Sequence, residues 1–213
     1  MVCGRGRVPV GGVRRHRVVW LLSNGDAARA RGLEPGEPFL AILETIIVLF
    51  TPALVGLFAA VHAYAPPERK SCGLAAFGFA LLLAGITGAL HFAELTAVRR
   101  TANRTVAEVF ALYDPGGRLT PALAFDLAAW DFFLGFGLLF AAPVFRGDRL
   151  QAAIRAGMTL GGLLCLAGVA GPASGDLRFQ YLGVFGYAFV FPLVCLLLAL
   201  LFARSGESVN QIV

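Results

Sequence analysis

Long stretches without a charged residue restrict the fold of this chain more than any other feature. They cover residues 45–67, 71–93, 156–175 and 179–203. Each is long enough to cross about 30 Å of hydrocarbon as an α-helix. A fifth stretch, 120–145, has a similar length but carries Asp126 and Asp131. All are continuously apolar and do not alternate, which excludes a transmembrane β-barrel.

The composition agrees with a chain whose main solvent is lipid. Hydrophobic residues make up 58% and charged residues 15% of the 213 residues, and the mean hydropathy is +0.75. Water-soluble domains of this size do not show that balance. The sequence predicts an all-α polytopic transmembrane helical bundle of about five helices. We expect them over residues 39–64, 72–98, 120–145, 150–171 and 179–204.

Two flanking segments complete the predicted organisation. Residues 1–38 form a basic tail, which is either disordered or an extension from a start codon assigned too far upstream. Residues 205–213 form a short polar C-terminal tail. Between the second and third spans, residues 105–113 have the pattern of a short amphipathic helix lying at the membrane surface. Thr120 followed by Pro121 is a helix-start signal for the third span.

The basic residues indicate an orientation in the membrane. Most of the 17 arginines lie in tails and loops beside spans, so the net charge of +5 predicts topology and no nucleic-acid partner. Twelve lysines and arginines lie on the side of the N-terminus and six on the other. The positive-inside rule therefore predicts a multi-pass protein of a bacterial-type inner (plasma) membrane with a cytoplasmic N-terminus. Without residues 1–28 the count is seven against six, so this prediction depends on the tail.

Ionisable residues inside the spans form the most informative pattern. Each costs about 2.5–3.5 kcal/mol at a helix centre, so each requires a reason. When the helices are threaded alternately through a bilayer, these side chains fall in one half of the membrane, and a tyrosine of the fifth span lies at the same depth. The set is Glu44, His91, Glu94, Asp126, Asp131 and Tyr187. The sequence thus predicts a polar cluster in one half of the bundle.

Within this set, Asp131 and His91 are the predicted proton-handling pair. Asp131 lies near the middle of its span, and His91 is the one histidine at that depth. A carboxyl group beside an imidazole can pass a proton to it and take it back. Glu44, Glu94 and Asp126 lie within two turns of an interface. The ordinary alternative for each of them is a solvated residue at a helix end.

Other chemistry finds less support in the sequence. One histidine with dispersed carboxylates is a weak metal-ligand set, so we expect no metal and no cofactor. The one lysine, Lys70, lies outside the uncharged runs, which argues against a retinal-type Schiff base. No phosphate-binding loop, nucleophile elbow or H-E-x-x-H motif occurs. Small residues at Gly157, Gly161 and Gly168 predict close helix packing or dimerisation.

Three functions fit these features. The leading hypothesis is a membrane protein that binds or translocates a small polar or protonatable species through the polar cluster. The alternatives are a membrane-embedded enzyme acting on a lipid or isoprenoid-like substrate and a non-catalytic assembly subunit. The expected partners are the lipid bilayer and either a second copy or another membrane protein. The sequence does not decide whether the chain is an enzyme.

Overall fold

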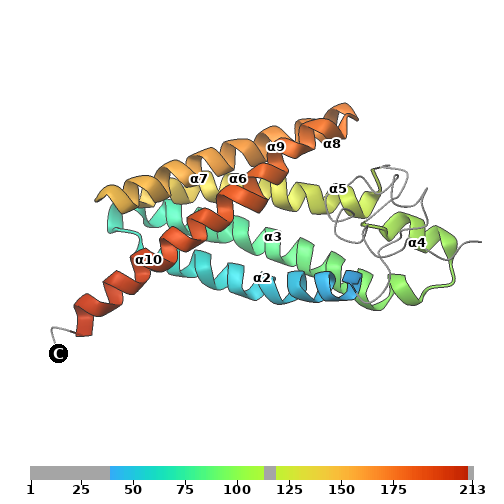
Figure 1. The fold of residues 1–213 in the computed structure, drawn as a ribbon, viewed down its shortest axis with the longest axis horizontal. Coiled ribbons are helices and arrows are strands. Elements are labelled where there is room, and N and C mark those ends of the chain that lie inside the picture. The colour runs from blue at the N-terminus through green and yellow to red at the C-terminus, as the bar shows by residue number, and fades with distance from the viewer. Residues whose placement is uncertain (1–38, 113–118, 211–213) are drawn as a thin grey trace, which may run out of the picture.

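The chain folds into a bundle of long helices, as predicted. The computed structural model describes residues 39–112 and 119–210, and every regular element in these ranges is helical (Figure 1). Five helices of the described chain are long and apolar enough to cross a membrane. They are Leu40–Tyr64, Pro67–Thr96, Pro121–Val144, Arg149–Ser174 and Leu177–Arg204, here called the first to fifth spans. The predictions for residues 1–38 and for the last three residues lie outside the described ranges.

The first two spans form an antiparallel pair. Helices α2 (Phe39–Tyr64) and α3 (Lys70–Thr96) lie side by side and are joined by the short helix η2 (Pro67–Arg69) (Figure 1). Lys70 Nζ donates hydrogen bonds to the carbonyl oxygens of His62 and Ala63, at 3.0 and 2.9 Å. These carbonyls belong to the last turn of α2, where the regular i to i+4 hydrogen bonding of the helix ends, and the His62 oxygen also accepts a hydrogen bond from the Ala65 amide at 3.2 Å. The lysine therefore caps α2 and fixes the turn between the two helices.

A short helix lies between the second and third spans. The turn η3 (Val98–Arg100) leads to α4 (Arg104–Phe110), within the segment where an interfacial helix was predicted. Asn103 caps α4, because its Oδ1 accepts hydrogen bonds from the amides of Thr105 and Val106. Three large apolar side chains of α4 are exposed, at Val106, Val109 and Phe110. That surface suits the boundary between headgroups and hydrocarbon.

The third span contains a change of helical geometry. It begins with α5 (Pro121–Leu127) and continues through the π-helical turn η4 (Ala128–Phe133) into α6 (Leu134–Ala141) and η5 (Ala142–Val144). The predicted start is confirmed, since Thr120 Oγ1 accepts a hydrogen bond from the amide of Leu123 and Pro121 is the first helical residue. A π turn bonds i to i+5, so it rotates the residues that follow it relative to a continuous α-helix.

The fourth and fifth spans complete the bundle. The fourth consists of α7 (Arg149–Gly168) and α8 (Ala170–Ser174). The fifth runs from η6 (Leu177–Phe179) through α9 (Gln180–Phe185) and a second π turn, η7 (Gly186–Val190), into α10 (Phe191–Asn210). Helix α10 crosses α2 and α3 obliquely in Figure 1. It remains helical to Asn210, beyond the predicted end at 204.

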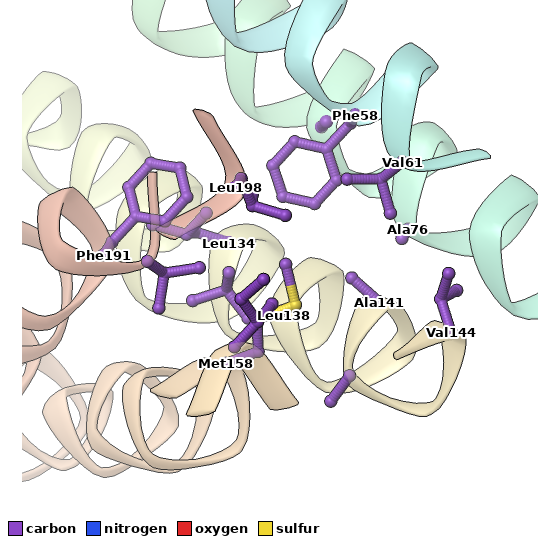
Figure 2. Packing of buried hydrophobic residues seen from close by; sticks show 14 of the residues in the cluster. Phe58, Val61, Ala76, Leu134, Leu138, Ala141, Val144, Met158, Phe191 and Leu198 are labelled. Carbon is purple, nitrogen blue, oxygen red and sulfur yellow. The ribbon is translucent and has the colours of Figure 1, made fainter. Parts of the chain in front are cut away.

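The interior and the surface are both apolar. Figure 2 shows buried side chains from α2, α3, α6, α7 and α10 meeting in one core, with Phe58, Leu138, Met158 and Phe191 among them. Leucine, isoleucine and phenylalanine also cover the outside, and Leu49 is 67% exposed. A surface of this kind suits contact with lipid and is unusual for a protein surrounded by water.

The glycines predicted for packing lie at contacts within the chain. A Cβ added at Gly157, Gly161 or Gly168 would come within 2.7 Å of Val194, 3.3 Å of Val190 and 2.7 Å of the Gly183 Cα, respectively. These contacts belong to α10, η7 and α9. Of the two roles predicted for this row, close packing between helices of the same chain is the one that the contacts support.

Candidate functional site

The buried polar residues of the described chain are concentrated in and beside the predicted cluster. Exposure is 1% for Glu44 and Thr87, 3% for His91, 0% for Asp131 and 8% for Gln180. Glu44 lies near the start of α2 and His91 near the end of α3. Because these helices are antiparallel, both residues lie at the same end of the bundle.

His91 is held by Glu44. Its Nδ1 lies 2.5 Å from Glu44 Oε2, which is a short hydrogen bond between two side chains that are almost completely buried. A hydrogen bond to a charged group is stronger than one between neutral groups. The contact therefore ties the start of α2 to the end of α3. It also shows Glu44 to be an interior residue rather than a solvated residue at a helix end.

Asp126 lies on the other side of the imidazole. Its Oδ1 is 3.5 Å from His91 Nε2 and accepts a hydrogen bond of 2.7 Å from Thr87 Oγ1. Thr87 is one turn before His91 on α3, so one face of this helix supplies both contacts to Asp126. We call Glu44, Thr87, His91 and Asp126 the His91 cluster. It joins the first three spans.

The cluster has the chemistry of a site that takes up and releases protons. An imidazole can donate hydrogen bonds from both ring nitrogens only as the imidazolium, and a carboxylate lies beside each nitrogen here. The carboxylates are on opposite sides of the ring. No group of three or more His, Cys, Asp or Glu side chains that could hold a metal ion is found in residues 39–112 and 119–210.

Asp131 does not pair with His91 as predicted. It lies in the π turn η4, and its carboxyl group sits between two glycines of other helices. A Cβ added at Gly168 of α7 would lie 2.9 Å from Asp131 Oδ1, and one at Gly183 of α9 would overlap the same atom. The structure therefore replaces the predicted pair with two sites, the His91 cluster and a separate site at Asp131.

Gln180, the first residue of α9, lies beside Asp131. Its Nε2 is 3.2 Å from the point where a Gly183 Cβ would stand, and the Asp131 carboxyl group meets the same point. The Gln180 amide is close enough to act electrostatically on the Asp131 carboxyl group and on Tyr187, but no hydrogen bond of good geometry satisfies the buried side-chain atoms of Asp131 and Gln180 within the described chain. Gln180 is not among the residues predicted from the sequence. The sequence feature that could have indicated this residue is a side-chain amide in an otherwise apolar span, three residues before Gly183.

Aromatic rings connect the two π turns. Trp130 of η4 and Tyr187 of η7 have ring centroids 5.3 Å apart, and Trp130 also stacks on Phe50 of α2 at 6.3 Å. Tyr187 is half-buried here, and Asp131 is within electrostatic range of it. π turns occur frequently at functional sites. Glu94 lies half-buried on α3, three residues beyond His91.

Comparisons with protein-family models, with curated proteins and with solved structures give no match for this chain.

Proposed function

We propose that the chain is an integral membrane protein that binds and translocates protons, alone or with a small protonatable species, and that the His91 cluster is its proton acceptor. The single observation that carries the proposal is the burial of one histidine between carboxylates of two other spans. A charged or titrating group within a span is costly and usually marks an ion or proton pathway.

The position of the cluster supports the same function. Three spans contribute to it, so a change in its charge would act on the contacts among α2, α3 and α5. Histidine is the side chain whose ordinary titration falls near neutral pH. Proton uptake at His91 is therefore suited to changing how these helices pack.

The proposal is tested by proton flux into proteoliposomes that carry a pH-sensitive dye and an imposed membrane potential. We expect His91→Gln to lower the flux by about a hundredfold, the low end of the loss when a positioned proton-transfer group is removed. The matched control is His62→Gln. It replaces a second histidine, which lies in the last turn of α2 and outside the cluster. It should keep the wild-type flux. Wild-type flux in His91→Gln would contradict the proposal.

The alternatives give different results in related experiments. A lipid-modifying enzyme would show no flux in the same vesicles, and the lipid composition of cells lacking the protein would change. An assembly subunit would show no flux and would co-purify with a fixed partner. Either result would replace the proposed function.

We propose further that the protein lies in a bacterial-type plasma membrane with its N-terminus in the cytoplasm. The balance of basic residues supports this orientation. An odd number of spans, five in the described chain, then puts the end of α10 and the C-terminus on the outside. Alkaline phosphatase fused after residue 213 is expected to be active, and a fluorescent protein that folds only in the cytoplasm is expected to be dark. The reverse pattern would contradict this orientation.

A further inference from the structure

Four buried polar atoms next to the π turn η4 have no hydrogen-bond partner in the described chain. They are Oδ1 and Oδ2 of Asp131 and Oε1 and Nε2 of Gln180. Leaving a buried polar group without a partner is costly, so four such atoms together require an explanation. Both side chains are more than nine-tenths buried, at 0% and 8% exposure. They approach the same point above Gly183.

Within residues 39–112 and 119–210, the surroundings supply no cation to balance a carboxylate at Asp131. The titratable groups within electrostatic range are Asp126 of α5, Cys165 of α7 and Tyr187 of η7, and none of them is a cation. On α3, His91 is held by Glu44 and Asp126. An ionised carboxyl group in such a place would be an unpaired buried charge.

One added proton makes the four atoms complementary. A neutral carboxylic acid has one O–H donor and one carbonyl acceptor, and a primary amide has N–H donors and a carbonyl acceptor. The acid O–H can donate to Gln180 Oε1 while Gln180 Nε2 donates to the other Asp131 oxygen. This cyclic pair needs only small side-chain rotations, because both groups already lie against Gly183.

We propose that Asp131 and Gln180 form a second proton-binding site, separate from the His91 cluster, in which the neutral Asp131 acid pairs with the Gln180 amide. The proton comes from the aqueous phase, and no other bond changes. When Asp131 loses the proton, Gln180 Oε1 loses its donor and an unpaired charge is left between α7 and α9. Proton occupancy is thereby coupled to the contact between the third and fifth spans.

Infrared spectroscopy of the full chain in lipid nanodiscs tests the site directly. At neutral pH we expect a carboxylic-acid C=O band that shifts in D2O and is lost in Asp131→Asn. That variant should fold, because an asparagine amide can form the same cyclic pair with Gln180. In Gln180→Leu the band should persist and move toward the position of an acid without a hydrogen bond. If that variant does not fold, Gln180→Met, which keeps the length of the side chain and adds no carboxyl group, replaces it in the same assay and must also shift the band.

The matched control is Asp176→Asn. The Arg178 guanidinium hydrogen-bonds to Asp176 and lowers the pKa of that exposed carboxyl group to about 2, so it is ionised and contributes no acid band. A spectrum with no band that Asp131→Asn removes would overturn the proposal, and a band insensitive to position 180 would overturn the pairing. The band does not depend on transport. Its presence without proton flux would contradict the proposed function and leave this site intact.

Discussion

Replacing Glu44 by leucine is expected to lower the free energy of unfolding by about 3–5 kcal/mol, the range for removing one partner of a buried ion pair. Glu44 is 1% exposed and lies 2.5 Å from His91, so the substitution leaves the imidazole buried without its closest partner. Denaturant titration in detergent micelles measures the change. Glu68→Leu, at an exposed glutamate of η2, is the control and should stay within about 0.5 kcal/mol of wild type.

The double variant Glu44→Leu/His91→Leu separates the pair from the packing around it. Replacing both partners of a buried ion pair by apolar side chains is often neutral or stabilising. We therefore expect the double variant to recover most of the stability that Glu44→Leu loses, while proton flux is lost. A double variant that is less stable than both single variants would mean that the two residues do not act as a pair.

The second large effect is expected at Gly168. A Cβ there would lie 2.7 Å from Gly183 Cα and 2.9 Å from Gly183 N, and backbone atoms cannot move aside as a flexible side chain can. Gly168→Ala is expected to destabilise the bundle by about 1–3 kcal/mol, as other overpacked sites do. The effect matters more in lipid, where close contact rather than the hydrophobic effect drives helix association.

Gly85→Ala is the matched control for Gly168→Ala in the same unfolding assay. Gly85 is an exposed helical glycine of α3 with no atom within 4 Å of an added Cβ. Alanine favours a helix over glycine by about 1 kcal/mol, so this variant is expected to be unchanged or more stable. Equal effects of the two substitutions would show that the α7–α9 contact is not as close as described.

The five spans could be predicted because the length of an uncharged run is set directly by the thickness of the bilayer. The start of the third span was also predictable, since Thr120 and Pro121 act through local hydrogen bonding and a fixed φ. The end of the last helix was not. The run of apolar residues ends near Arg204, but the α-helix continues to Asn210. Helix α10 therefore extends beyond its apolar part.

The contacts that the polar residues make could not be predicted from the sequence, for a different reason. The prediction assumed a continuous α-helix through Asp126 and Asp131, whereas the π turn over Ala128–Phe133 begins between them and contains Asp131. The stretch AAWDFF has no feature that distinguishes it from an ordinary helical segment. Tertiary packing is what permits the π turn, since α3 and α7 both pack on this part of the third span. The depth of each residue was therefore predictable, whereas the direction of its side chain was not.

The π turn in the third span also sets a limit on the hydrophobic thickness that the bundle can match. Pro121–Val144 has 24 residues and is the shortest span of the described chain, whereas Pro67–Thr96 has 30. As continuous α-helices they would measure roughly 36 and 45 Å. A π turn places an extra residue in a turn, so the third span is shorter still. The hydrocarbon thickness of the bilayer must match the length of this span. The longer helices then adjust by tilting or by extending into the headgroups.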